Sequence, residues 1–183
     1  MKFHKTPLEG VHLVELEKLE DSRGFLARLF CERSFAEAGL ESRFVQINNS
    51  VSRRKGILRG LHYQAPPHSE AKLLRAIRGA IFHVVVDVRR GSPSFSKWFG
   101  TEVNDKNRLM LYIPRGCAHG ILSLTDDVEI IYMASAFYTP GSERGVRFDD
   151  PHIGIEWPFA PVEVSDKDRA WPDLTPAQAV TTD

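Results

Sequence analysis

The feature that most constrains the fold is an alternation of side chains between Ile81 and Val88. One face of this segment carries only apolar side chains, those of Phe82, Val84, Val86 and Val88. The opposite face carries Ile81, His83, Val85 and Asp87. A period of two residues is that of a β-strand, because successive side chains of a strand point to opposite sides of the sheet. The segment therefore predicts a strand.

Similar strand-like runs follow one another along most of the chain, with turn residues between them. The runs are Gly24–Phe30, Phe44–Val51, Lys72–Ile77, Trp98–Val103, Arg108–Ile113 and Glu129–Phe137. The turns are Arg78–Gly79, Arg90–Pro93, Asn104–Asn107, Pro114–Gly116 and Thr139–Gly141. The spacing of about ten residues between strands predicts many short strands joined by tight connections.

Helix signals are scarce. Ser34 and Glu37 have the spacing of a capping box and Gly39 is a natural stop, so we expect one short helix near Ser34–Ala38. The strands do not alternate with helices as a parallel α/β sheet requires. The pattern therefore predicts a mainly all-β fold with a few short helices, in the form of an antiparallel sandwich, barrel or jelly roll.

Composition places the chain among soluble globular proteins. Its 183 residues fit a single domain, residues 1–183, with 42% hydrophobic and 26% charged residues. Because 24 basic residues balance 24 acidic ones, nothing favours binding to nucleic acid or to a membrane, and an anion would need a local cluster of positive groups.

The ends of the chain and its two cysteines bear on where the protein works. Residues 1–10 lack the apolar run of a signal peptide, and no later stretch has the length of a membrane span. Cys31 and Cys117 do not form a disulfide framework, so we expect free thiols in the cytoplasm. Residues 175–183 lack strand periodicity, and we expect a frayed, flexible tail there.

The segment Arg59–Gln64 contains a histidine, His62, that is a candidate for chemistry. A lone strand histidine is more often a structural group. Here Arg59 and Lys72 are near in sequence, and His119 lies between glycines that allow a ligand to approach closely. Strict alternation would put Arg59 and His62 on opposite faces. Either Gly60 marks a bulge or Arg59 reaches over a rim, and both alternatives stay open.

Metal binding and thiol chemistry are the alternatives for these histidines. Metal sites in barrels of this type usually use two histidines separated by one residue, whereas Gln64 stands two residues after His62. We therefore expect no metal. Cys117 lies two residues before His119, but a buried packing thiol is the favoured interpretation. Taken alone, Tyr132 would be a core tyrosine and Asp168 part of a solvated turn.

Eight segments together resemble one known family. They are Asp21–Phe25, Phe44–Asn48, Arg59–Gln64, Ala71–Arg75, Pro114–Gly120, Phe137–Tyr138, Gly154–Pro158 and Ser165–Asp168. The family is that of the dTDP-4-dehydrorhamnose 3,5-epimerases, and the resemblance covers about residues 8–172. It implies a cupin-type jelly roll, a homodimer that exchanges N-terminal strands, a dTDP-sugar substrate, and chemistry that uses no metal or other cofactor.

The resemblance also implies roles for individual residues. His62 would be the general base, Asp168 its hydrogen-bonded partner, Tyr132 the acid on the opposite face of the sugar, and Lys72 the cation near the C4 carbonyl oxygen. The substrate or its diphosphate would be held by Arg59, His119 and Lys167. The remaining binding residues would be Tyr138, stacked on thymine, and Arg23, Arg28, Gln46, Asn48 and Glu143.

This arrangement suits the chemistry of a 4-keto sugar. The ketone acidifies the protons on C3 and C5, because each carbanion delocalises onto oxygen as an enolate. Inversion then needs a neutral base on one face, an acid on the other, and positive charge at the oxygen. A donor preorganised there contributes on the order of 3–4 kcal/mol.

Four positions depart from the family pattern: Arg28 and Ile47 near the implied nucleotide site, and Cys117 and Ile121 beside His119. The last two are expected to reshape the pocket around the sugar. A monofunctional 3- or 5-epimerase of a related 4-keto sugar nucleotide is therefore the nearest alternative. A metal-dependent cupin enzyme and a non-catalytic sugar-nucleotide binding module are more distant ones.

Overall fold

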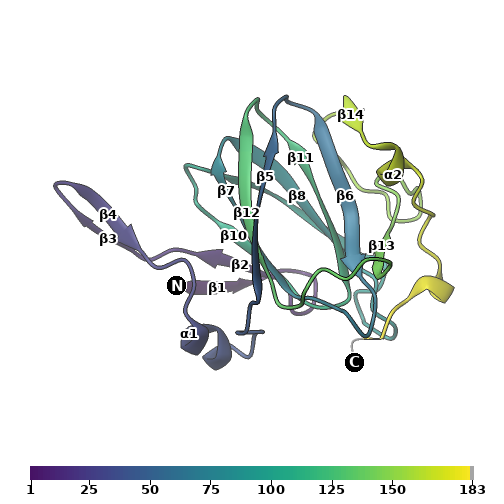
Figure 1. Cartoon of the computed structure of the whole chain (residues 1–183), viewed down its shortest axis with the longest axis horizontal. Helices are drawn as coiled ribbons and strands as arrows, with labels where there is room; N and C mark the ends of the chain where they lie inside the picture. The colour runs from purple at the N-terminus through teal and green to yellow at the C-terminus, as the bar shows by residue number, and fades with distance from the viewer. Residues whose placement is uncertain (182–183) are drawn as a thin grey trace.

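Two six-stranded sheets form the body of the protein in the computed structural model, which describes residues 1–181 (Figure 1). The strand order of the first sheet is β1 (Lys2–Lys5), β2 (His12–Glu15), β10 (Met110–Ile113), β7 (Lys72–Arg78), β12 (Val128–Ala134) and β5 (Gln46–Ser52). That of the second is β13 (Glu143–Gly145), β6 (Ile57–Gln64), β11 (Cys117–Ser123), β8 (Ala80–Asp87) and β9 (Trp98–Asn104), with β14 (Glu163–Val164) parallel to β6. All other pairings within the two sheets are antiparallel, and the predicted cupin-type jelly roll is confirmed.

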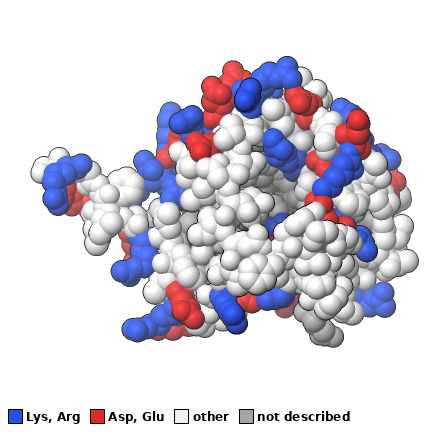
Figure 2. Space-filling model, viewed as in Figure 1, with Lys and Arg blue, Asp and Glu red and all other residues white. Residues whose placement is uncertain are grey.

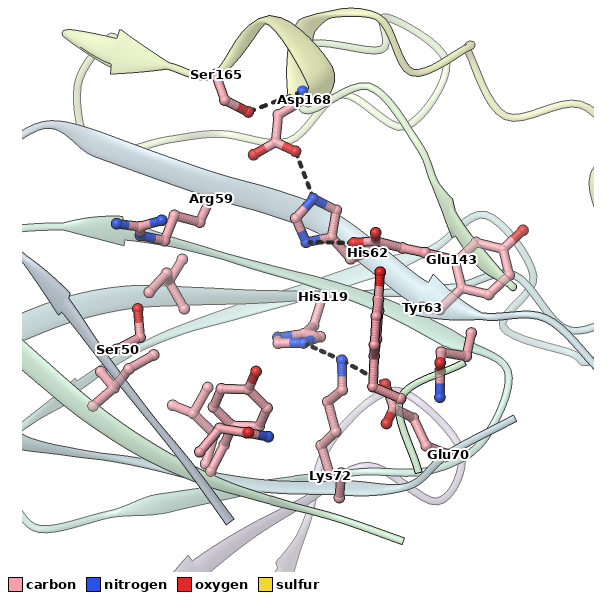
Figure 3. A pocket seen from close by; sticks show the side chains of 18 of the residues that line it. Ser50, Arg59, His62, Tyr63, Glu70, Lys72, His119, Glu143, Ser165 and Asp168 are labelled. Atoms are coloured by element: carbon pink, nitrogen blue, oxygen red, sulfur yellow. Dashed lines mark hydrogen bonds and ion pairs between the residues drawn. The ribbon is translucent and has the colours of Figure 1, made fainter. Parts of the chain in front are cut away.

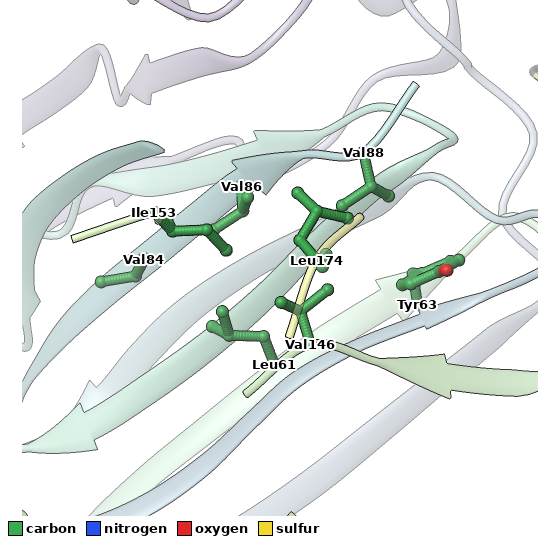
Figure 4. Packing of buried hydrophobic residues seen from close by; sticks show 9 residues of the cluster. Leu61, Tyr63, Val84, Val86, Val88, Val146, Ile153 and Leu174 are labelled. Atoms are coloured by element: carbon green, nitrogen blue, oxygen red, sulfur yellow. The ribbon is translucent and has the colours of Figure 1, made fainter. Parts of the chain in front are cut away.

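The β8 strand shows why the alternating segment has so many apolar residues. Val84 and Val86 lie in one buried cluster and Ile81 in another, so both faces of the strand are covered. The first face packs on Val146 and Leu174, which belong to the chain that returns across the outer side of the second sheet (Figure 4). His83 projects from the other face, between the two sheets, and is fully buried.

A hairpin near the N-terminus stands away from this body (Figure 1). It consists of β3 (Lys18–Asp21) and β4 (Gly24–Ala27), which pair only with each other among the described strands. Leu19 and Leu26 lie directly opposite one another in the hairpin and are 72% and 70% exposed. Two adjacent apolar side chains this exposed are typical of a surface that contacts another chain.

The short helix was predicted in the right place but with the wrong start. Helix α1 spans Glu32–Glu37 with Cys31 as its N-cap, and no side chain caps it, so the capping box expected from Ser34 is wrong. The helix begins earlier because the Phe35 amide donates to the Cys31 carbonyl and the Phe35 ring is buried against the first sheet. Gly39 ends the helix with φ +71°, as predicted.

The chain end is more regular than expected. Pro176–Gln178 form a 3₁₀ helix, and Val180 bridges to Arg89. The expected lack of regular structure is therefore wrong as far as Val180, because main-chain hydrogen bonds join this segment to the strand end at Val88. Residues 182 and 183, on which the same expectation falls, lie outside the described part of the chain. None of the helices in residues 1–181 has the length and apolar composition that crossing a membrane requires.

Candidate active site

A cavity of about 460 Å³ opens between the two sheets. Figure 2 shows a hollow in this face of the molecule, with basic and acidic side chains next to each other at its rim. Both sheets and the loops that follow them contribute to its lining. Eleven of the thirteen predicted site residues line it: Gln46, Asn48, Arg59, His62, Lys72, His119, Tyr132, Tyr138, Glu143, Lys167 and Asp168.

His62 and Asp168 form a close polar pair in the cavity. The Nε2 atom of His62 lies 2.5 Å from Oδ1 of Asp168 (Figure 3). Asp168 belongs to the short helix α2 (Asp166–Arg169), where its amide donates to the Ser165 hydroxyl that caps the helix. Burial alone would raise the pKa of Asp168, but hydrogen bonds from His62 and from the Gly60 amide hold it below its ordinary value. Asp168 is therefore an anion that fixes the orientation of the imidazole.

A bulge at Gly60 decides on which face Arg59 lies. His62 pairs with His119 while Arg59 pairs with Ile121, so three steps along β6 match two along β11. The extra residue brings Arg59 and His62 to the same side, and the alternative in which Gly60 marks a bulge is confirmed. Gly60 has φ +131°, and an added Cβ would meet backbone of Gly120 at 2.5 Å. Only glycine fits where β6 and β11 approach this closely.

Lys72 faces the cavity from β7, in the opposite sheet. Its Nζ atom lies 2.9 Å from Oε1 of Glu70 and 3.1 Å from Nε2 of His119 (Figure 3). The Lys72 and Glu70 side chains are 12% and 9% exposed, so this ion pair is largely shielded from water. The ammonium group also lies 5.8 Å from the centre of the Tyr132 ring. The cation is thus held beside Tyr132 with two of its three protons directed to protein acceptors.

Tyr132 extends from β12 of the first sheet, whereas His62 extends from β6 of the second. The two side chains therefore enter the cavity from opposite sides. Burial raises the pKa of Tyr132, and the negative charges of Glu70 and Glu143 raise it further. The phenol stays protonated at neutral pH and can donate a proton.

The rim of the cavity carries a second ion pair and a hydrogen bond that positions Tyr138. Lys167 Nζ lies 2.6 Å from Oε2 of Glu143, whose other oxygen is 3.8 Å from Nδ1 of His62. The Tyr138 amide donates to the side-chain oxygen of Gln46 at 2.5 Å, which places the exposed Tyr138 ring at the mouth. Exposed ion pairs are weak, so a ligand can displace Lys167 from Glu143 at little cost.

Two predicted site residues are not brought to the cavity of their own chain. Arg23 lies in the turn of the projecting hairpin, where it pairs with Asp21 at 2.6 Å. Arg28 is exposed just beyond the same hairpin. Ile47, which was expected near the nucleotide site, is 70% exposed and does not line the cavity.

The expectation that Cys117 shapes the sugar pocket is wrong, because its side chain packs against Val85 and Ile113 instead of lining the cavity. Burial raises the pKa of this thiol to about 12, so the packing interpretation of Cys117 is confirmed. Ile121, by contrast, does line the cavity.

Sequence reasoning missed Glu70, Ser165 and Trp171. Glu70 stands two residues before Lys72, a spacing that places both on one side of an extended chain. Ser165 and Asp168 have the spacing of a helix N-cap, which could have revealed helix α2. Trp171 packs against His62 in a T-shaped arrangement with ring centres 6.2 Å apart, and no local pattern predicted that contact.

One group of side chains in residues 1–181 has the geometry of a possible metal site: Asp150, His152 and Asp173, with ligand atoms within 4.8 Å of one another. None of the three lines the cavity. Within the cavity His62 is engaged by Asp168, and His119 by Lys72.

A jelly roll that holds a carboxylate-bound imidazole, a phenol and an ammonium group in one cavity defines a cupin-type enzyme of the acid–base class. The chain belongs to the dTDP-4-dehydrorhamnose 3,5-epimerase family, whose model of that description matches residues 5–176. The resemblance read from its motifs is thereby confirmed.

Individual relatives agree with this assignment. The dTDP-4-dehydrorhamnose 3,5-epimerase of Methanothermobacter thermautotrophicus is 44% identical over 176 residues, covering 94% of each chain. The Legionella pneumophila dTDP-6-deoxy-D-glucose-3,5-epimerase, solved in complex with dTDP-4-keto-L-rhamnose, matches with a TM-score of 0.91 at 34% identity over 100% of this chain and 98% of that one. A 3'-monoepimerase of Streptomyces bikiniensis in complex with dTDP-quinovose matches with a TM-score of 0.87 at 36% identity, covering 96% and 88%.

Proposed function

We propose that this enzyme converts dTDP-4-dehydro-6-deoxy-D-glucose to dTDP-4-dehydro-L-rhamnose by inverting C3 and C5 of the sugar. The observation that carries the proposal is the entry of His62 and Tyr132 into one cavity from opposite sheets. A sugar ring bound between the sheets would have a base on one face and an acid on the other. Inversion at a carbon next to a ketone needs that arrangement.

The base would be the Nδ1 atom of His62. Asp168 accepts a hydrogen bond from Nε2, so the neutral ring carries its proton there and leaves Nδ1 free for the proton of C3 or C5. The Asp168 carboxylate then stabilises the imidazolium that forms. Electrons from the broken C–H bond move to the C4 oxygen, where the Lys72 ammonium would stabilise the enolate. Tyr132 would return a proton to the opposite face of the carbon.

The nucleotide would lie along the rim of the cavity. Arg59 and Lys167 are the positive groups there that can meet a diphosphate, with His119 deeper in the cavity. The exposed ring of Tyr138 offers a stacking surface for thymine, and Gln46, Asn48 and Glu143 offer hydrogen bonds to the base and ribose. These roles follow the family resemblance and agree with the placement of each side chain.

We further propose a homodimer that exchanges its N-terminal hairpins. Strand β5 is the last strand of the first sheet and has one unpaired edge among the described strands. The hairpin β3–β4 projects from the same chain with Leu19 and Leu26 exposed. An open strand edge and a projecting apolar hairpin are complementary, because added strands satisfy edge hydrogen bonds and bury apolar side chains.

Pairing of the hairpin beside β5 of a second copy would carry Arg23 and Arg28 toward the partner's cavity, since Gln46 and Asn48 of β5 line it. The nucleotide site would then contain residues of both subunits. Cytoplasmic localisation completes the proposal, and the free thiols of Cys31 and Cys117 suit a reducing compartment.

Complementation tests the exchange. The variants Arg23→Ala and His62→Asn should each be inactive or nearly so as homodimers. In a mixed dimer one cavity would contain both substitutions and the other cavity neither of them. Random pairing of equal amounts makes half of the dimers mixed, each with one intact cavity of two, so about a quarter of wild-type activity should return. If Arg23 acted within its own chain, every cavity of a mixed dimer would keep a lesion and no activity would return. Light scattering gives the molar mass of each sample.

Deuterium labelling tests the reaction itself. Substrate incubated with enzyme in D₂O should gain deuterium at both C3 and C5, measured by NMR and mass spectrometry. The His62→Asn variant should incorporate none, because no base remains to break the C–H bond. Turnover by this variant at the wild-type rate would refute the mechanism.

A monofunctional epimerase is the second candidate. The match to a 3'-monoepimerase and the presence of Ile121 in the cavity wall both favour considering it. The same chemistry at one carbon needs no other residues. Label at C3 alone, or at C5 alone, would establish this second function in place of the first.

A further inference from the structure

His83 is a buried histidine that the proposed mechanism does not use. It lies on β8 with no exposed surface, and its Nε2 atom is 3.2 Å from Nδ1 of His119. Nε2 of His119 is in turn 3.1 Å from Nζ of Lys72. The three side chains form a line of hydrogen bonds from the middle of the sandwich to the cavity.

Elementary hydrogen-bond chemistry gives this line a direction. The Lys72 ammonium group can only donate, so Nε2 of His119 must accept and carries no proton. A neutral His119 therefore has its proton on Nδ1, which donates to Nε2 of His83. The proton of His83 then lies on Nδ1, an atom that is buried and has no hydrogen-bond partner among residues 1–181. A buried donor without a partner is uncommon and indicates a functional constraint.

We propose that His83 is a positioning residue that holds His119 in the Nδ1–H tautomer, so that His119 accepts from Lys72 and aims its ammonium group. This inference rests on the proposed function, in which Lys72 stabilises the enolate. Glu70 and His119 take two of the three ammonium protons. The third proton is then left for the C4 oxygen of the substrate. With Nε2–H on His119, two donors would face each other and Lys72 would turn away.

Burial, together with the positive charge of Lys72, keeps both imidazoles neutral. Burial lowers the pKa of His83 to about 3, and the positive charge of Lys72 contributes. Burial, followed by Lys72, His83 and His62, holds the pKa of His119 well below its ordinary value. The phenol of Tyr132 and the carboxylate of Glu70 complete the set of titratable groups around Lys72. Lys72 thus remains the single cation of this line.

Nitrogen-15 NMR of the wild-type protein tests the tautomer directly, because protonated and bare imidazole nitrogens have well-separated shifts. We expect Nδ1–H on His119 and on His83 at neutral pH. A proton on Nε2 of His119 would overturn the inference. This measurement needs neither a variant nor substrate, so it stands even if the proposed reaction fails.

Two substitutions then test the consequence. His83→Leu removes the acceptor, and His119 should populate both tautomers. The rate of deuterium exchange into substrate should fall about tenfold with little change in KM, less than the roughly 10²–10³-fold that loss of an oxyanion donor costs. His83→Gln retains an acceptor oxygen and should recover most of the rate. The exposed His152→Leu, outside the cavity, is the matched control.

The outcomes that would refute the role of His83 differ from the one that would refute the proposed reaction. Wild-type exchange rates and a single tautomer in His83→Leu would overturn the proposal, as would a rate in His83→Gln no higher than in His83→Leu. If His83→Leu does not fold, the wild-type spectrum and the rate of His83→Gln decide. Absence of exchange in the wild type would refute the proposed function alone and leave the tautomer result intact.

Discussion

The substitution Asp168→Asn isolates the contribution of one negative charge to the base. Asp168 is 4% exposed, and its carboxylate lies 2.5 Å from Nε2 of His62 and accepts a second hydrogen bond from the Gly60 amide. Asparagine has nearly the same shape and can still accept one hydrogen bond. The fold should therefore survive, and the loss should fall on the imidazolium that forms when His62 takes a proton.

The size of the effect follows from the contact. A hydrogen bond to a charged group is worth about 1.5–3 kcal/mol. Because about 1.4 kcal/mol corresponds to a tenfold change in rate, losing that stabilisation in the transition state should lower kcat by about 10- to 150-fold. KM should change little, since Asp168 contacts His62 on the side of the imidazole that faces away from Lys72 (Figure 3).

The assay is the rate of deuterium incorporation from D₂O at saturating substrate, with NMR detection at C3 and C5. Asp166→Asn is a matched control, because it removes the same charge from an exposed position of the same helix. It should retain wild-type activity. An Asp168→Asn enzyme as fast as the wild type would refute the role of Asp168, and an equal loss in Asp166→Asn would show that the effect comes from the helix and not from the contact.

Three further predictions concern the acid, the bulge and the buried imidazole. Tyr132→Phe should keep part of the exchange at a substrate carbon but block inversion, as seen by NMR of the product; normal inversion would show that another group is the acid. Gly60→Ala should lower the free energy of unfolding by at least ~1–3 kcal/mol in urea titrations, because φ +131° and the contact with Gly120 both oppose a Cβ; an unchanged midpoint would contradict the bulge. In the folded protein the pKa of His83 is lowered from its ordinary 6.5 to about 3. Between pH 6.5 and pH 3 the imidazole is therefore protonated in the unfolded chain but not in the folded one. The free energy of unfolding should fall as the pH falls through this range, by up to ~1.4 kcal/mol per pH unit. Urea titrations of His83→Leu between pH 4 and 6 should show a slope smaller by one proton, and equal slopes would mean that His83 is protonated in the folded state.

Most of the longer strands could be predicted from the sequence because burial dictates their pattern. Each predicted run overlaps a strand, and the β8 segment alternates between two buried clusters as its side chains require. Strands β1 and β3 were missed because each has only four residues and is mostly exposed, and β13 because it has only three residues. Without a buried face, such strands leave no alternation in the sequence. Their pairing partners decide their conformation.

The site could be predicted only in part, because its contacts are made across the sandwich. His62 and Asp168 are 106 residues apart, and no local pattern joins them, so their pairing came from the family resemblance. Alternation alone placed Arg59 on the wrong face, since the extra residue of the bulge reverses the order. His83 looked like one polar residue on a strand face. The role proposed for His83 depends on its contact with His119, which lies on the neighbouring strand β11.

The ion pairs of the cavity differ in burial, and that difference separates binding from chemistry. Glu70–Lys72 and His62–Asp168 are shielded from water, so removing Lys72 or His62 would leave a buried carboxylate without its partner. Glu143–Lys167 is at the rim, with the Lys167 side chain 54% exposed. An incoming diphosphate can attract Lys167 and Arg59 and leave the inner pairs in place. The groups that would move protons are therefore already oriented before substrate arrives, which is the condition under which electrostatic stabilisation of an enolate is strongest.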